Sequence, residues 1–255
     1  MDLAEINAGD ILVSHATAIA AAGWPFDSAE DDAMSDLSAY DLVIWATAEE
    51  STVDASFDTD QQALIRAFVA DGGALWASGA EIFWDLGERG SAEDNAFALE
   101  VLGAAYAADD CGCDEATGEG LLAGLTMAFG RPYPVEWADE LDPVGEVLAR
   151  YPDGEVAGAI SGKVAVFGFP FDAMNDAEVR AELAARLLPV LLPDWVPADT
   201  GEADTKAKTP RPGRPAPMPS GGGCDGGGFP AGAAGVGLAA LVVVGLRRRR
   251  DTRSA

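Results

Sequence analysis

Two short runs of apolar residues, separated by one amphipathic segment, constrain the fold of this chain more than any other feature. Residues Asp41–Thr47 (DLVIWAT) and Ala74–Ser78 (ALWAS) are apolar without alternation, as expected of parallel strands that are buried on both faces. Between them, Thr59 and Gln62 have the spacing of a capping box, and a glycine pair follows the expected helix. A strand, a helix and a second strand in this order predict a parallel βαβ unit.

The same alternation continues toward the C-terminus. We expect a helix that begins after Ser91, a short strand at 104–108, a hairpin of 155–160 with 163–169, and a last helix after Asn175. Strands and helices that alternate over short connections favour an open sheet with helices on both faces. The fold predicted for residues 1–196 is therefore a flavodoxin-like three-layer α/β/α domain with a mostly parallel sheet.

The beginning of the chain does not supply the central strand with which such folds usually start. Residues 10–22 (DILVSHATAIAAA) have apolar side chains at helical spacing, so they predict a first helix. Residues 1–10 have neither a basic segment nor a long apolar core, so they do not resemble a secretory signal. We therefore expect a domain truncated at its N-terminus, with its first strand encoded ahead of Met1.

The charge of the chain is strongly negative and unevenly distributed. The formal net charge is −27, and residues 1–199 hold 39 of the 43 acidic residues but seven of the 16 Lys and Arg. Such a domain repels nucleic acid and anionic lipid, which excludes both as its partners. The acidity is typical of a soluble domain in a salty or exported setting.

The C-terminal part of the chain predicts a spacer followed by a membrane anchor. Residues 197–223 are rich in Pro, Gly and small polar residues, so we expect a disordered linker there. Residues 229–246 carry no charge, and a helix of that length spans about 27 Å, close to a bilayer core of about 30 Å. The four arginines that follow stay cytoplasmic by the positive-inside rule, which places the domain on the extracytoplasmic side. They are Arg247, Arg248, Arg249 and Arg250.

Residues 224–255 resemble the MYXO-CTERM sorting signal of myxobacterial surface proteins. The residues that carry the resemblance are the glycine-rich segment 221–227 around Cys224, the apolar run and the arginine cluster. The resemblance implies processing near Cys224 by a sorting protease or other membrane machinery, and display of the protein on the cell surface. A component of the cell envelope would then be its partner.

Three segments together resemble a class I glutamine amidotransferase-like domain over about residues 10–195. They are 40–52 (YDLVIWATAEEST), 72–97 (GGALWASGAEIFWDLGERGSAEDNAF) and 163–172 (KVAVFGFPFD). The resemblance extends to uncharacterised domains of large exported bacterial proteins, some of them beside peptidoglycan amidase regions. For an active amidotransferase it implies a Cys on a tight turn (Gly-x-Cys-x-Gly) and a late His two residues before a Glu.

The catalytic residues of that family are not found at the matching positions. Residues 77–81 (ASGAE) contain no Cys, and Ser78 would need a base to replace it. Residues 169–172 (FPFD) contain no His. The one histidine, His15, lies on the first predicted helix, where a packed or solvated side chain is the usual outcome. We therefore expect neither amidotransfer nor a His-dependent hydrolysis.

Two functions remain open from the sequence. The favoured one is a non-catalytic amidotransferase-like module that is anchored at the cell surface for binding or architecture. The alternative is an accessory domain of a larger secreted cell-wall hydrolase, of the N-acetylmuramoyl-L-alanine amidase kind, whose catalytic part lies upstream of Met1.

Acidic residues follow the two apolar strands and supply the candidate site. Glu49 and Glu50 come after the first strand and Glu81 comes after the second. Open α/β sheets bind ligands beyond the carboxyl ends of their strands, so three carboxylates there would hold Ca²⁺ or Mg²⁺ or act as an acid–base pair. In the alternative, which we favour and which requires no cofactor, Glu81 belongs to a Ser78–Glu81 capping box and the other two are solvated. Asp85 and Asp172 are weaker candidates for the same rim.

Two cysteines flank Gly112 in an acidic loop. Cys111 and Cys113 would form a redox pair or a metal clip, or they would remain surface thiols, unpaired or locally paired. We favour the surface thiols, and whether the two pair stays open at this point.

Overall fold

The structure is a computed structural model, and it describes residues 8–28, 35–49 and 55–195. The predicted linker 197–223, Cys224, the apolar run 229–246 and the arginine cluster lie outside the described residues, as does Glu50. Among the helices of those three ranges, none combines the length and the apolar character that a membrane crossing requires.

Helices and strands alternate in the first half of the domain, and strands dominate the second half. The elements are α1 (Ala8–Ala21), β1 (Leu42–Glu49), α2 (Thr59–Ala70), β2 (Ala74–Ala80), α3 (Ile82–Leu86), α4 (Ala92–Phe97) with a π-helical turn (Ala98–Leu102), β3 (Ala104–Ala108), β4 (Glu115–Gly118), a 3₁₀ turn (Gly120–Leu122), β5 (Thr126–Ala128), β6 (Glu140–Pro143), β7 (Glu146–Arg150), β8 (Val156–Ser161), β9 (Val164–Phe167) and α5 (Ala177–Leu191). The predicted helix at 10–22 is therefore confirmed as α1, and the predicted hairpin is confirmed as β8 and β9, which pair antiparallel.

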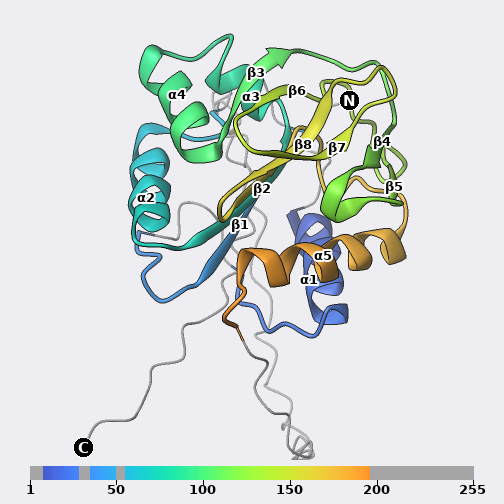
Figure 1. The fold of residues 1–255 in the computed structure, drawn as a ribbon, viewed down its shortest axis with the longest axis horizontal. Helices are drawn as coiled ribbons and strands as arrows, with labels where there is room; N and C mark the ends of the chain where they lie inside the picture. The colour runs from blue at the N-terminus through green and yellow to red at the C-terminus, as the bar shows by residue number, and fades with distance from the viewer. Residues whose placement is uncertain (1–7, 29–34, 50–54, 196–255) are drawn as a thin grey trace, which may run out of the picture. The chain divides into compact units, whose positions relative to one another are not determined.

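The strands form one curled, mixed sheet (Figure 1). Its order is β1-β2-β9-β8-β7-β4-β5, with β3 joined to it through β6 and β8. The pairs β1–β2 and β2–β9 are parallel. All other strand pairs of the described residues are antiparallel. The predicted flavodoxin-like, mostly parallel sheet is thus wrong.

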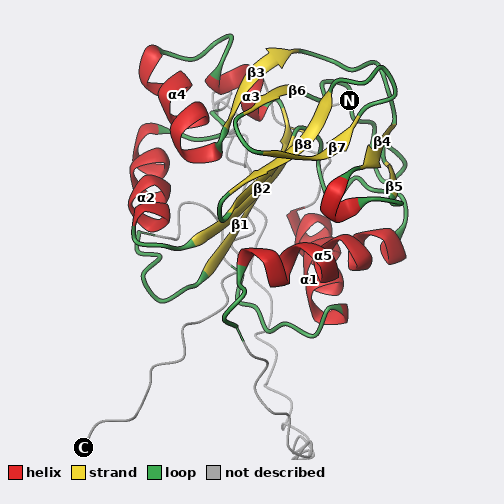
Figure 2. Ribbon diagram, in the orientation of Figure 1, coloured by secondary structure: helices red, strands yellow, loops and turns green. Residues whose placement is uncertain are grey.

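The length of the connections explains this correction. A parallel neighbour requires a crossover of a dozen or more residues, usually through a helix, whereas antiparallel strands can follow one another through tight turns. Between β3 and β9 the chain contains strands, loops and the 3₁₀ turn, without an α-helix to cross the sheet (Figure 2). The alternation of the βαβ unit therefore does not continue into this segment, which lacks crossover helices.

Two apolar cores lie on opposite faces of β1 and β2. Leu42 and Ile44 pack with α1 and α5 on one face. Val43 and Trp45 pack with α2, α3 and α4 on the other. Because every side chain of these strands meets a helix or a loop, the apolar runs show no alternation, and the prediction of two strands buried on both faces is confirmed. Among the described residues β1 pairs with β2 alone, and a further strand ahead of Met1 stays a prediction.

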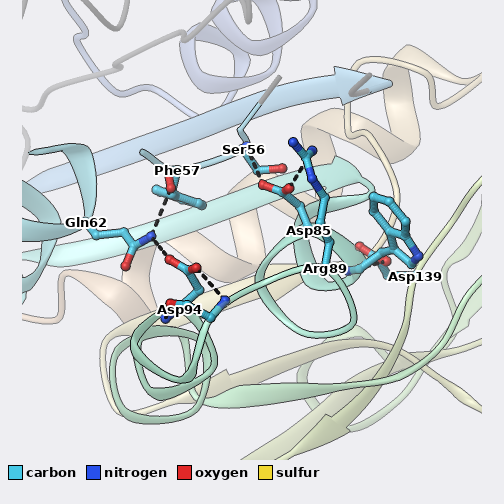
Figure 3. Close-up of polar contacts among 9 residues, drawn as sticks. Ser56, Phe57, Gln62, Asp85, Arg89, Asp94 and Asp139 are labelled. Atoms are coloured by element: carbon cyan, nitrogen blue, oxygen red, sulfur yellow. Dashed lines mark hydrogen bonds and ion pairs between the residues drawn. The ribbon is translucent and has the colours of Figure 1, made fainter. Parts of the chain in front are cut away.

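The helix caps differ from the predicted ones by one residue in two cases. The capping box of α2 is formed by Asp58 and Gln61, whereas Gln62 donates to Phe57 O and to Asp94 (Figure 3). The predicted cap at Ser91 is confirmed, with Asp94 as its partner. The cap of α5 is Asp176 rather than Asn175. In both cases two neighbouring polar residues could form the cap. Gln62 and Asn175 make hydrogen bonds to other segments instead, so the residues beside them form the caps.

Candidate functional site

A β-bulge places Glu49 at the end of β1. The register between β1 and β2 shifts after Ala46, so that Thr47 has no partner in β2 and Ala48 lies opposite Gly79. Ala48 has a φ of 55°, a left-handed conformation that is uncommon outside glycine. Bulges of this kind redirect the side chains that follow them, and here the next side chain is the carboxyl of Glu49.

Glu81 occupies the tip of the turn between β2 and α3. β2 ends at Ala80 and α3 begins at Ile82, so the strand passes into the helix through one residue. Glu81 has φ 68° and ψ −1°, again left-handed, and its side chain makes no capping hydrogen bond. The predicted capping box of Ser78 and Glu81 is wrong, because Ser78 is still part of β2 and is fully buried. Glu81 therefore occupies the turn between strand and helix, the position at which a hydrolase with such a turn presents its nucleophile.

Asp139 supplies the cap that α3 lacks. Its two carboxylate oxygens accept hydrogen bonds from the backbone N–H groups of Phe83 (2.8 Å) and Trp84 (3.0 Å). Asp139 is fully buried, and this burial raises the pKa of its carboxyl, while the two N–H donors act in the opposite direction. The beginning of α3, and with it Glu81, is therefore held by a residue from the loop before β6.

Three carboxyl groups stand at or directly after the ends of β1, β2 and β3, and the charges of two of them act on the third; we call Glu49, Glu81 and Asp109 the acid cluster. Glu81 is 3% exposed, and burial, followed by the charges of Asp109 and Glu49, raises its pKa to about 7. Burial also raises the pKa of Glu49 to about 7 and, with the charge of Asp110, raises the pKa of Asp109. Each group keeps one buried oxygen without a hydrogen-bond partner among the described residues.

Backbone groups of two loops surround the acid cluster. The backbone N–H of Glu136 donates to Glu49 Oε1 at 3.0 Å. After Asp109, Asp110 has a φ of 58°, and Cys111 and Cys113 form a disulfide bond. The backbone N–H of Cys111 donates to Ala138 O at 3.3 Å, which joins the two loops. The two cysteines are therefore locally paired, one of the states left open above, and the bond begins two residues after Asp109.

A second set of polar side chains, His15, Tyr133 and Asp172, is buried or half-buried between α1 and the segment after β9. His15 is fully buried, its Nδ1 donates to Ile11 O at 2.9 Å, and its ring lies 4.7 Å from that of Phe171. Burial lowers the pKa of His15 and raises that of Asp172, which accepts a hydrogen bond from the Tyr133 hydroxyl at 2.5 Å. Of the two outcomes expected for His15, packed or solvated, the structure has the packed one.

Tyr133 connects this group to the acid cluster electrostatically. Its burial, the hydrogen bond to Asp172 and the charge of Glu49 all raise the pKa of the Tyr133 hydroxyl. The carboxylate of Asp85 is engaged by other residues. It accepts a hydrogen bond from the backbone N–H of Ser56 at 2.9 Å and forms an ion pair with Arg89 at 3.0 Å (Figure 3). Of the two weaker candidates, Asp172 bonds to Tyr133, on which the charge of Glu49 also acts, and Asp85 acts on Glu81 through its charge.

The charges of Glu49 and Asp109 both act on Glu81, and a shared site of Glu49 and Glu81 stays a prediction. Within the described residues no three His, Cys, Asp or Glu side chains are placed to hold one metal ion. Asp109, Asp139 and Tyr133 were not predicted from the sequence. Asp109 follows the predicted strand 104–108, so the rule applied to Glu49 and Glu81 would have found it. Asp139 and Tyr133 lie in a loop without a periodic pattern, and no sequence signal marks them.

A comparison of the chain with known protein families and with curated proteins finds no match.

Proposed function

We propose that the domain is a ligand-binding module of the cell surface and that it does not hydrolyse amides. The observation that carries this proposal is the identity of the residue at the strand-to-helix turn. A carboxyl group, Glu81, stands where an amidotransferase-like hydrolase would present its nucleophile, and its unpartnered oxygen is an acceptor for a ligand's donor.

The positions of the other candidate catalytic side chains support binding over hydrolysis. Ser78 is fully buried inside β2, with no hydrogen-bond partner for its hydroxyl among the described residues. His15 is fully buried as well and uses Nδ1 on the carbonyl of its own helix. A serine nucleophile requires a base within hydrogen-bond reach and access to the substrate. Neither requirement is met by these two residues.

The placement at the cell surface rests on the sequence of the tail. The apolar run 229–246 and the cluster Arg247–Arg250 would anchor the chain with the domain outside the membrane, and Cys224 would mark the processing site. Fractionation of cells that express the protein, followed by protease treatment of intact cells, tests this. Domain that is protected from protease in intact cells would contradict the surface placement.

The proposal is tested by incubating the purified full-length protein with glutamine and with N-acetylmuramoyl-peptide amides while ammonia and free amine are measured. We expect no turnover above the rate of a Glu81→Ala variant. Turnover at enzymatic rates that the variant loses would show instead that the acid cluster is catalytic, and the proposal would fail.

A further inference from the structure

We propose that the domain has a further binding site, at the opposite end of β2 from Glu81, and that this site takes a small aliphatic carboxylate. The site is a cavity of about 570 Å³, lined by residues from the end of α2, the π-helical turn and the turns that follow β6 and β8. Its volume falls within the range of about 300–1,000 Å³ that is usual for small-molecule sites. The proposal rests on the place of the cavity, its apolar walls and one cation.

The cavity lies where β2 and β9 begin. Gly72 and Gly73 line it just before β2, and Lys163 and Val164 line it at the start of β9. The two strands are parallel, so both lead away from the cavity toward the end of β2 after which Glu81 stands. The seven residues of β2 span about 23 Å as an extended strand. The cavity and the acid cluster are therefore separate sites that can be tested independently.

Five aliphatic side chains form the apolar walls of the cavity. Val101 and Val164 are buried, whereas Leu99 is 49% exposed and Val144 is 62% exposed. The fifth is Val69. Of the five large hydrophobic side chains that are exposed in the described part of the chain, two therefore stand on this one cavity. Exposed apolar groups that gather at one place are typical of a binding surface, because a ligand removes them from water.

Lys163 supplies the positive charge of the site. Its Nζ donates to Gly72 O at 3.2 Å, which places the ammonium group on the cavity wall. This bond uses one of its three N–H donors, and Lys163 forms no ion pair within the described ranges. The acidic residue of the lining, Glu100, is paired with Arg66 at 3.2 Å. The charge of Lys163 is therefore left without a counterion in the lining.

Backbone donors of the lining are already used inside the protein. The N–H groups of Gly72 and Gly73 donate to the carbonyl groups of Val69 and Phe68, each at 3.0 Å. The N–H group of Val144 donates to the carbonyl of Gly103 at 2.9 Å, so the ammonium of Lys163 is the principal donor left for a ligand. A carboxylate offers one negative charge and acceptor oxygens for its remaining donors, in a charge-assisted hydrogen bond.

The acidity of the whole domain does not exclude an anion from this cavity. Residues 1–199 hold 39 acidic and seven basic residues, but the field of exposed charges is largely screened beyond about 8 Å at physiological salt. The charges of the lining therefore decide, and they are Lys163 and the neutral pair of Glu100 with Arg66. The repulsion that remains disfavours a doubly charged phosphate more than a singly charged carboxylate.

The test is isothermal titration calorimetry of the purified full-length protein with octanoate, with 1-octanol and octylammonium as ligands of equal length and different charge. We expect one octanoate per chain, bound about tenfold more tightly than octanol, because octanol forms no charge-assisted bond with Lys163. Octylammonium should bind more weakly than octanol, because Lys163 repels it. Uptake of ligand by the tail or by detergent is common to all variants and cancels when they are compared.

Two kinds of variant separate the charge from the apolar walls. Lys163→Met keeps an aliphatic side chain without the charge, so octanoate should bind about as weakly as octanol, while octanol is unaffected and Lys163→Arg retains octanoate. Leu99→Gln changes an exposed wall residue and should weaken octanoate and octanol by similar factors, which decides the matter if Lys163→Met does not fold. Arg131→Met removes an exposed cation outside the lining and should bind both ligands like the wild type.

Equal affinities of the wild type for octanoate and octanol would overturn the proposal. So would unchanged octanoate binding in Lys163→Met or in Leu99→Gln, or a loss in Arg131→Met as large as that in Lys163→Met. A dimer that forms without ligand and dissociates in Leu99→Gln, seen by analytical ultracentrifugation, would assign the cavity to a second copy of the chain and refute the proposal. None of these results bears on glutamine turnover or on Glu81, so the proposed function stands or fails separately.

Discussion

The hydroxyl oxygen of Thr47 fills the space that a Cβ atom on Gly79 would occupy, at a distance of 1.8 Å from that position. Thr47 is the bulged residue of β1, and Gly79 is the residue of β2 that faces the bulge. The bulge that positions Glu49 is therefore accommodated by the absence of a side chain on the neighbouring strand, two residues before Glu81.

Gly79→Ala should therefore destabilise the domain, because the new methyl group overlaps Thr47. Overpacking in a buried site typically costs about 1–3 kcal/mol, and the loss should appear as a lower midpoint in urea unfolding. Thr47→Ala alone should change stability less, and the double variant should recover part of the loss, because the overlapping oxygen is gone. If the two changes were simply additive, the contact between Thr47 and Gly79 would not be the cause.

Asp139→Ala should destabilise the domain by about 2–4 kcal/mol. The variant leaves the N–H groups of Phe83 and Trp84 without their acceptor at the beginning of α3, and each buried donor left unpaired costs about 1–3 kcal/mol. Thermal unfolding of the variant measures the effect. Asp142→Ala, which removes an exposed aspartate of β6, should stay within about 0.5 kcal/mol of the wild type. Equal losses in the two variants would contradict the capping role of Asp139.

Glu49→Gln should raise stability at pH 8 and leave it unchanged at pH 4. The pKa of Glu49 is raised from 4.5 to about 7 in the folded state, so between these values the folded protein binds the proton more tightly than the unfolded chain does. Stability must fall as pH rises through that interval, and the variant removes this loss. We expect a gain of about 1–2 kcal/mol at pH 8, because the group is partly exposed. Urea unfolding across pH 4–8, with Glu146→Gln as the control, measures it.

Reduction of the disulfide should change the stability of the domain only slightly. Cys111 and Cys113 are two positions apart, and a loop that short stabilises by less than about 2 kcal/mol in the chain-entropy account. Titration of the full-length protein with a thiol reagent should find one thiol, that of Cys224, before reduction and three afterwards. Three thiols in the oxidised protein would show that the disulfide does not form.

Local patterns were sufficient for the elements that depend on near neighbours. The buried runs around Val43 and Trp76, the cap at Ser91 and the hairpin at Gly162 were all predicted from residues within a few positions of each other. The pairing of Cys111 with Cys113 was left open, because spacing alone does not determine whether two thiols are oriented toward one another.

The site was predicted only in part, because it assembles across long separations. Glu49 and Glu81 were found from their places after strands, but Asp139 contacts Phe83 across 56 residues and Glu136 contacts Glu49 across 87. No periodic pattern records such pairs. The predicted Ser78–Glu81 capping box was wrong because it depended on where β2 stops, and β2 continues to Ala80, paired and buried to that point.

The sequence by itself determined that β1 and β2 are buried parallel strands with acids at their ends. Both features show in consecutive residues: an apolar run without alternation, followed directly by a carboxyl group. The tertiary structure alone decided that β9 pairs parallel with β2 while the other later pairs are antiparallel, that Glu81 rather than Ser78 stands at the turn, and that the charges of Glu49 and Asp109 act on Glu81. These features depend on which distant segments pack together, and packing decides between alternatives that are nearly equal in local free energy.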